Sequence, residues 1–325
     1  MKVVITIGTG NSGCGAVHDF LTKNTKYKSP FQSQEFRMID DPDGILNLYY
    51  NFYKNHSINN PSNAIMRFKN YVKNLVNLKI KINNKNVKVY DKNILLLTDR
   101  YIENITTLNY RAFPQFIGIQ TNFFKRFFFT LKKKIGKTNS KNYLFKMYLP
   151  VKEDIFFKQT KNYLNGILKY QLKNNKTKHV ILDQSINMWN FINIFSYFDD
   201  VKVILITRDP RGIYNSMKNR QSKAYPWDNL KVWTDWFEKI MWKFNDYKKK
   251  IPKKLQKHVL EIKLEDFVKK NGKEQKKILN FLNISKIDNK FDTNITRFNA
   301  YKAKHELSNF EQNHIKKQLS RYLQW

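Results

Sequence analysis

The alternation of apolar and polar positions divides the chain into short buried strands and amphipathic helices. Val3–Gly8 is a continuous apolar run that ends in glycine, which is typical of a parallel strand buried on both faces. Gly13–Lys23 then has the spacing of a first helix, and apolar runs return at His179–Asp183, Val201–Thr207 and Val259–Lys263. Strands that alternate with helices predict an α/β fold with a largely parallel sheet and a ligand at the carboxyl ends of its strands.

Start signals mark the helices between these strands. Asp209 is a good N-cap, and Pro210 suits the first position of a helix. Val232–Lys248 has the pattern of a long amphipathic helix, and a capping box that begins at Ser308 opens another near the end of the chain. A further helix is expected over Asn187–Phe198, because its apolar positions follow directly on a strand.

Residues 45–176 have a different pattern, which predicts a mostly helical insertion. Leu78–Tyr90 alternates as a small hairpin would, with an Asn-rich turn. Helical spacing occurs over Ile45–Asn55, Ala64–Val76 and Ile155–Leu172. We therefore expect a single α/β domain over residues 1–325, with the insertion as a cap that specifies the substrate.

Two shorter segments before and within the insertion are read as extended. Gln34–Ile39 is expected to be a short strand, closed by the turn-forming residues 40–44. Asn93–Asp99 resembles a strand whose terminal Asp reaches magnesium in triphosphatases. Because the loop residues that accompany such a strand are missing, we interpret it as an ordinary strand.

Composition narrows the class of protein. The chain has 325 residues, 41% of them hydrophobic, so it can bury a large core. Its single cysteine, Cys14, excludes an intrachain disulfide and a cysteine-based metal cluster. No apolar run approaches the roughly 20 residues that span a bilayer, and the N-terminus lacks the pattern of a signal peptide. A cytoplasmic enzyme is expected.

The formal net charge of +34 does not by itself indicate nucleic-acid binding. Lysine far outnumbers arginine and is spread along the whole chain, and Asn and Ile are also abundant, as in proteins of AT-rich genomes. No zinc-finger spacing, RNA-binding aromatic signature or basic zipper is present. The charge favours attraction to anionic substrates, nucleotides or a membrane surface.

A glycine-rich loop follows the first strand and is the first candidate site. Gly8 and Gly13 have the spacing of a nucleotide-triphosphatase loop, yet the Lys and Ser/Thr that would hold the phosphates and magnesium are missing. Backbone N–H groups and the positive end of a helix remain, which are enough for one phosphate. The residues of this candidate phosphate cradle are Gly10, Asn11, Ser12, Gly13, Cys14 and Gly15.

A second motif lies at the end of the strand Val201–Thr207. Arg208 follows this strand directly, and Ser216 comes eight residues later in the next helix. This spacing resembles the 3′-phosphate signature of the sulfotransferases, and GTGNSGCG resembles that family's 5′-phosphosulfate loop. The resemblance implies a three-layer P-loop-type fold and the donor 3′-phosphoadenosine 5′-phosphosulfate, with no metal required. Arg208 and Ser216 would then bind the 3′-phosphate.

Two cations of the family pattern are absent from this chain. Asn11 stands where the loop normally has Lys or Arg, and Gln184 stands where a second lysine often follows the preceding strand. Loss of one preorganised electrostatic stabiliser costs about 2.7–4 kcal/mol in the transition state, so another cation is expected to compensate. The candidates for that replacement are Arg37, Arg211, Lys302 and Lys304.

The resemblance also indicates where the acceptor would react. Glycan-type sulfotransferases place a catalytic glutamate after the first helix, and Glu35 has that relative position. His18 is a second candidate base, although a histidine on an amphipathic helix is often a packing residue. Arg37, Asp183 and Gln184 are candidate acceptor-binding residues. The expected reaction transfers a sulfuryl group to a hydroxyl of a carbohydrate or lipid-linked glycan.

Two other classes stay open at this point. One is a small-molecule kinase or other P-loop nucleotide enzyme, and the other is a nucleotide-binding or membrane-surface protein that has lost catalysis. Phe123–Lys134 interleaves aromatic and cationic residues. This pattern is typical of a helix at a membrane surface, which would be the inner membrane surface for a cytoplasmic protein, or of a buried aromatic face with solvated lysines.

Overall fold

The structure is a computed structural model that describes residues 1–31, 34–82, 84–112, 145–173, 177–269, 272–285, 287–288 and 291–324, with Phe127 and Leu131. Its contacts divide the chain into two compact units. The first unit combines Met1–Asp40 with Leu168–Trp325, and the second is Asp41–Ile167.

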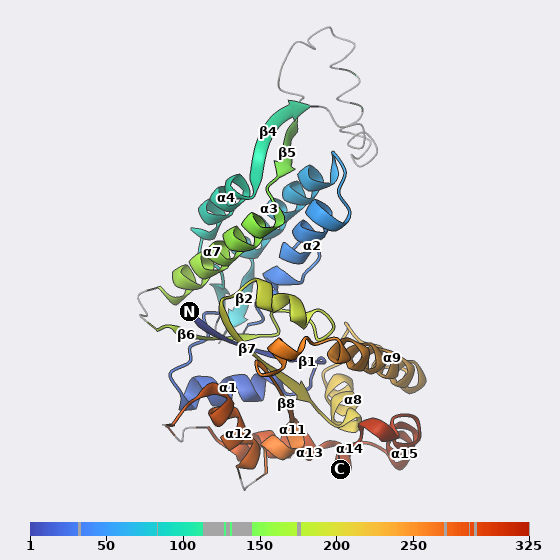
Figure 1. The fold of residues 1–325 in the computed structure, drawn as a ribbon. Helices are drawn as coiled ribbons and strands as arrows, with labels where there is room; N and C mark the ends of the chain where they lie inside the picture. Colours follow the sequence, from blue (N-terminus) through green and yellow to red (C-terminus); the bar gives the residue numbers. More distant parts are fainter. Residues whose placement is uncertain are drawn as a thin grey trace. The chain divides into compact units, whose positions relative to one another are not determined.

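The first unit contains a four-stranded sheet in the order β6-β1-β7-β8 (Figure 1). All three strand pairs are parallel. The strands are β1 (Lys2–Gly8), β6 (His179–Asp183), β7 (Asp200–Thr207) and β8 (Val259–Lys263). The α/β class and all four predicted strands are confirmed.

The order of these strands positions the glycine loop. From β1 the chain moves to β6 on one side, and from β6 it crosses back to β7 on the other side of β1. Such a reversal opens a crevice at the carboxyl ends of the two strands that flank it, here β1 and β7. Gly8, the last residue of β1, is paired with Ile206, so the glycine loop and Arg208 leave the sheet side by side.

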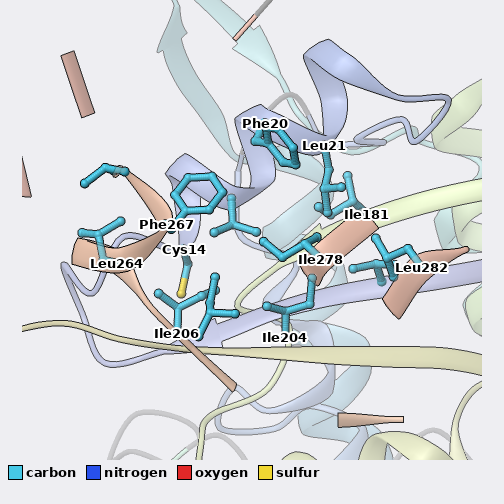
Figure 2. Packing of buried hydrophobic residues seen from close by; sticks show 14 of the residues in the cluster. Cys14, Phe20, Leu21, Ile181, Ile204, Ile206, Leu264, Phe267, Ile278 and Leu282 are labelled. Carbon is cyan, nitrogen blue, oxygen red and sulfur yellow. The ribbon is translucent and has the colours of Figure 1, made fainter. Parts of the chain in front are cut away.

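One face of the sheet packs against α1 (Cys14–Asn24), α11 (Leu264–Phe267) and α12 (Lys273–Leu282). Alternate strand residues point to this face, as the two-residue period of a strand requires. Figure 2 shows Ile181, Ile204 and Ile206 of the sheet beneath the helical side chains Phe20 and Phe267. This cluster fixes α1 on the sheet and therefore fixes the loop that leads into it.

The remaining elements of the first unit surround the same sheet. They are α8 (Pro210–Asn219), α9 (Leu230–Lys249), α10 (Lys253–Gln256), α13 (Thr293–Tyr301), α14 (Ala303–Glu306), α15 (Asn309–Gln318), η4 (Phe191–Ser196) and η5 (Ser320–Tyr322). The predicted starts are confirmed: the Asp209 side chain accepts from the N–H of Arg211, and Ser308 and Glu311 form the capping box.

Two expectations in this unit were wrong. Asn187–Phe198 is not an α-helix but a turn followed by the short 3-10 helix η4, because Asp40 accepts hydrogen bonds from the Asn187 and Asn190 side chains. Gln34–Ile39 is not a strand either. Only the 3-10 turn η1 (Arg37–Ile39) forms there, and Phe36, Met38 and Ile39 are all buried, so the segment lacks the alternation of an edge strand.

The second unit is built from helices and two antiparallel hairpins. The predicted helices and the hairpin within Leu78–Tyr90 are confirmed. The elements are α2 (Ile45–Tyr49), the π-helical turn η2 (Tyr50–Lys54), α3 (Asn60–Asn77), α4 (Ile94–Asn104), α7 (Glu153–Leu172), β2 (Lys79–Ile82), β3 (Lys85–Lys88), β4 (Thr106–Ala112) and β5 (Phe145–Pro150).

The strand expected at Asn93–Asp99 was wrong, because this segment begins α4. Ile94, Thr98, Tyr101 and Ile102 are buried at helical spacing, whereas Leu96 is 63% exposed. A run of three leucines therefore spans both faces of a helix.

The segment Phe123–Lys134 lies outside the described residues, apart from Phe127 and Leu131, so its contact with a membrane stays a prediction. Among the described residues, no helix is both long enough and apolar enough to cross a bilayer.

The packing in Figure 2 predicts a large loss of stability for Phe267→Ala. Phe267 is fully buried and packs edge-on against Phe20, so truncation should lower the free energy of unfolding by about 3–5 kcal/mol. The matched control is Phe298→Ala, at a position that is 65% exposed, where the loss should stay below about 1 kcal/mol. Urea denaturation of both variants checks this, and equal losses would contradict the packing.

Candidate functional site

A cavity of about 730 Å³ lies at the carboxyl ends of β1, β6 and β7. It collects most of the residues that the sequence singled out. Those that line it are Gly10, Asn11, Ser12, Gly13, Cys14, Gly15, Glu35, Asp183, Gln184, Arg208 and Ser216. The sequence missed Asn215, Asn219, Arg220, Tyr225 and a wall from α13 that includes Asn299. His18 and Arg37 are not among the described residues that line the cavity.

The glycine loop turns from β1 into α1 with two residues in left-handed conformation. Asn11 has φ 63° and Gly13 has φ 98°, and the N–H of Ser12 donates to the carbonyl of Thr9 at 3.0 Å. A side chain at Gly13 would also collide with Leu264, at 2.6 Å. No side chain caps the first turn of α1; the N–H of Ala16 donates to the carbonyl of Gly13 at 3.0 Å, which leaves the N–H groups of Cys14 and Gly15 as donors for an anion at the cavity.

Arg208 also lines the cavity and is in direct contact with this loop. Its Nη1 donates to the backbone carbonyl of Asn11 and to Ser216 Oγ, both at 2.9 Å, and its Nη2 donates to the carbonyl of Asn299 at 2.7 Å. The two residues of the predicted 3′-phosphate motif are therefore in direct contact. Arg208 is 8% exposed, and its buried Nε has no hydrogen-bond partner.

The environment of Arg208 leaves its positive charge incompletely compensated. Its pKa is lowered to about 10, mainly by burial; the negative charges of Glu265 and Asp209 oppose this shift, and the positive charge of Arg220 adds to it. The group stays cationic at neutral pH. Gly212 is required for this arrangement, because a Cβ there would lie 2.7 Å from Arg208 Nε. A buried cation with an unused donor is suited to an anionic ligand.

A model of the sulfotransferase family matches residues 104–288, more than half of the chain. The chain belongs to the sulfotransferase family. The match includes Arg208 and Ser216, while the glycine loop and Glu35 precede it.

The chain is also similar to solved structures of sulfotransferases, at low sequence identity. The sulfotransferase domain from the curacin biosynthetic pathway is 13% identical, with 98% of this chain and 97% of that chain covered and a TM-score of 0.38. Sulfotransferase STF1 from Mycobacterium tuberculosis is 10% identical, with 98% and 76% covered and a TM-score of 0.40. The domain from the Synechococcus olefin synthase is 12% identical, with 98% and 94% covered and a TM-score of 0.37. A search of curated proteins returns no match.

Arg220 is the cation that this sulfotransferase places beside the unusual loop residue Asn11. Its Nη1 donates to Asn11 Oδ1 at 3.2 Å, and it forms no ion pair with any described residue. The sequence did carry a signal for it. Arg208, Gly212, Ser216 and Arg220 recur at four-residue intervals, which puts them on one face of the helix that follows β7.

The replacements proposed from the sequence are engaged elsewhere. Arg211 is buried in a bidentate ion pair with Asp209, its Nη2 lying 2.8 Å from Oδ2. Lys302 lines the cavity but pairs with Glu306 at 2.7 Å. Lys304 stacks over the ring of Tyr301 and is not among the described residues that line the cavity.

Glu35 lines the cavity and is held between two side chains. Gln184 Nε2 donates to its Oε1 at 3.1 Å, and Arg37 Nη1 donates to its Oε2 at 3.0 Å. The second departure from the family pattern, Gln184, thus orients the candidate base. Gln184 also has a left-handed backbone, with φ 43°, directly after β6.

Tyr225 closes the loop side of the cavity next to this glutamate. A Cβ on Gly10 would lie 2.1 Å from the Tyr225 hydroxyl oxygen, so only glycine permits this contact. Burial raises the pKa of Tyr225, and the negative charge of Glu35 raises it further. No sequence motif identifies this tyrosine.

Asp183 lies at the end of β6 and accepts a 2.7 Å hydrogen bond from Thr6 Oγ1. Burial raises its pKa to about 6, although the bond from Thr6 opposes the shift. This carboxyl is therefore tied to the sheet, and Asp183 also lines the cavity.

His18 and Cys14 are packing residues in the structure. His18 is 2% exposed, its Nδ1 lies 3.6 Å from the Asp19 carboxylate, and its buried Nε2 has no partner. A base has to reach the acceptor, so its position does not favour the catalytic role considered for it. The Cys14 thiol is directed into the core (Figure 2), and burial raises its pKa. Only its backbone is suited to contacting a phosphate.

Glu265 supports the site from behind. It is 2% exposed, accepts from the N–H of Asp209 at 3.1 Å, and its Oε2 has no partner. Burial raises its pKa to about 7. The folded state therefore binds a proton that the unfolded chain releases above about pH 4.5.

This shift predicts a pH dependence of stability that Glu265→Gln removes. The stabilisation from protonated Glu265 is complete below about pH 4.5 and is lost as the pH rises through about 7, up to about 3 kcal/mol in all. Between pH 5 and pH 8, the unfolding free energy of the unmodified protein should therefore fall more than that of the variant. Urea denaturation at both pH values measures the difference.

The control for this experiment is Glu103→Gln, because Glu103 is an exposed carboxylate. It should keep the pH dependence of the unmodified protein. If Glu265→Gln also kept it, the carboxyl of Glu265 would not be the group that titrates.

Proposed function

We propose that this sulfotransferase uses 3′-phosphoadenosine 5′-phosphosulfate and transfers its sulfuryl group to a hydroxyl of a carbohydrate or lipid-linked glycan. The observation that carries the proposal is the contact of Arg208 with both Ser216 and the carbonyl of Asn11 at one end of the cavity. Two separate anion-binding elements, a glycine loop and a buried guanidinium, suit a nucleotide that carries phosphate at two positions.

The donor half of the site fits such a nucleotide on three grounds. The buried cation Arg208 lines the cavity, no side chain caps the first turn of α1, and the cavity volume lies in the range of small-molecule sites. The donor supplies an activated sulfuryl group whose leaving group is a phosphate. Arg208 and Ser216 would hold the 3′-phosphate, and the N–H groups from Gly10 to Gly15 the 5′-phosphate.

The acceptor half is proposed at Glu35. A carboxylate oriented by Gln184 and Arg37 can take the proton of an attacking hydroxyl. Asp183 and Tyr225 add polar groups at the same side of the cavity, which would suit the hydroxyl groups of a sugar. The second unit, Asp41–Ile167, is proposed to select the acceptor, and a cytoplasmic location remains an expectation.

The rival nucleotide enzymes predict a different ligand response. A kinase would require magnesium and a triphosphate, whereas the proposed donor site requires a 3′-phosphate. Position 14, where triphosphatases use lysine, carries a cysteine whose thiol lies in the core. A catalytically impaired protein would bind 3′-phosphoadenosine 5′-phosphate without transferring the sulfuryl group.

The donor assignment predicts a selective thermal shift. Saturating 3′-phosphoadenosine 5′-phosphate should raise the melting temperature more than adenosine 5′-phosphate does. In Arg208→Ala the advantage should disappear, since a charge-assisted hydrogen bond contributes about 1.5–3 kcal/mol. Arg321→Ala is the control, because Arg321 is exposed, pairs with Glu238 and is not among the described residues that line this cavity. Equal responses of the unmodified protein to the two nucleotides would refute the 3′-phosphate site.

The base assignment predicts that Glu35→Gln separates catalysis from donor binding. Turnover should fall about 10²- to 10⁴-fold, because the amide cannot accept the proton, while binding of 3′-phosphoadenosine 5′-phosphate stays the same. Radiolabelled donor with panels of monosaccharides and glycolipids measures transfer. Glu103→Gln serves as the control, and unchanged turnover in Glu35→Gln would exclude Glu35 as the base.

A further inference from the structure

The missing loop lysine leaves a chemical requirement unmet. As the bond from sulfur to the bridging oxygen breaks, an electron pair remains on that oxygen of the departing 5′-phosphate, and the acceptor oxygen forms the new bond to sulfur. The acceptor proton goes to Glu35 under the proposed function. The charge that gathers on the phosphate oxygen needs a cation close to the loop, and Asn11 brings none.

Arg220 is the cation that lies at this position. Its Nη1 is 3.2 Å from Asn11 Oδ1, and both residues line the cavity. It is the C-cap residue of α8 and follows Ser216 by four positions, about one helical turn. Asn11 reaches it from a left-handed backbone, a conformation that Asn adopts more readily than lysine does.

The charges around Arg220 favour a multiply charged anion between the two arginines. The hydrogen-bond acceptors of Arg208 and Arg220 are neutral oxygens, and of the described residues none forms an ion pair with either guanidinium. The positive charge of Arg220 lowers the pKa of Arg208, as expected for two cations that line one cavity. Glu265 and Asp209 balance Arg208 only in part, and Arg220 is exposed without an ion-pair partner among the described residues, so an anion that contacts both guanidinium groups would be attracted by both.

We propose that Arg220 replaces the loop lysine and stabilises the 5′-phosphate leaving group during transfer. Asn11 is then a positioning residue, which holds the guanidinium over the loop through its side-chain oxygen. The proposal rests on the proposed function for the identity of the leaving group. It makes the protein an active transferase rather than an impaired relative, because the charge is relocated and not lost.

The test pairs two arginine variants with two mononucleotides. Arg220→Gln should weaken the binding of adenosine 5′-phosphate and of 3′-phosphoadenosine 5′-phosphate about 10- to 100-fold, and leave the binding of adenosine 3′-phosphate unchanged. Arg208→Ala should instead weaken the binding of adenosine 3′-phosphate and of 3′-phosphoadenosine 5′-phosphate, and leave the binding of adenosine 5′-phosphate unchanged. Calorimetric titration measures each affinity. Turnover of Arg220→Gln with the radiolabelled donor should fall about 10²- to 10³-fold.

Rescue separates a catalytic charge from a structural contact. The turnover of Arg220→Lys should be at least tenfold higher than that of Arg220→Gln. The double variant Asn11→Lys with Arg220→Gln, which returns a lysine to the loop, should show at least the same gain over Arg220→Gln. The control is Lys223→Gln, three positions after Arg220. Lys223 is an exposed cation and is not one of the described residues that line the cavity. It should match the unmodified protein in turnover and affinity, and all variants should keep its melting temperature without ligand to within a few degrees.

The outcomes distinguish this inference from the proposed function. If Arg220→Gln behaved as Lys223→Gln does while the unmodified protein still preferred 3′-phosphoadenosine 5′-phosphate, Arg220 would have no such role and the donor site would stand. If the unmodified protein showed no such preference, the proposed donor would be wrong. Selective loss of adenosine 5′-phosphate in Arg220→Gln would then still identify a phosphate site at Arg220.

Discussion

The burial of one guanidinium determines how the carboxyl edge of this sheet is built. Arg208 is removed from water, so its charge must be supported by hydrogen bonds, and three neutral oxygens accept them from Nη1 and Nη2. Those oxygens come from the glycine loop, from α8 and from α13. Gly212 leaves the space that the side chain occupies. One cation thereby connects three elements that are far apart in the sequence, and their meeting point is the cavity.

The two departures from the family pattern have a common physical form. Asn11 and Gln184 both follow a strand of the sheet with a left-handed backbone, and each side-chain amide binds a charged neighbour. Asn11 accepts from Arg220, and Gln184 donates to Glu35. An amide cannot supply charge, but it can orient a group that does. The site thus contains two pairs of side chains, Asn11 with Arg220 and Gln184 with Glu35. In each pair a neutral amide that follows a strand orients a charged residue from another segment.

The sequence predicted the parts of the fold that depend on local pattern. Continuous apolar runs identified the four parallel strands, and Asp209 and Ser308 identified helix starts, because caps act within one turn. Asn93–Asp99 was predicted as a strand although it begins a helix, because Leu96 lengthens the apolar run in the sequence but is exposed in the structure. The site motifs converged on one cavity, whereas Arg220 and Tyr225 went unrecognised. Their importance depends on contacts with Asn11 and Gly10, more than 200 positions away in the sequence.

The register of β1 and β7 sets the distance between the loop and its cations. In triphosphatase loops the lysine belongs to the loop itself, so loop and charge move together. Here the N–H groups follow β1, whereas Arg208 and Arg220 follow β7, with Gly8 paired to Ile206. A slip of one residue would displace the arginines by about 3.3 Å and break every contact to Asn11. The hydrophobic side chains that hold the sheet in register, such as Ile204 and Ile206 in Figure 2, therefore also determine the electrostatics of the site.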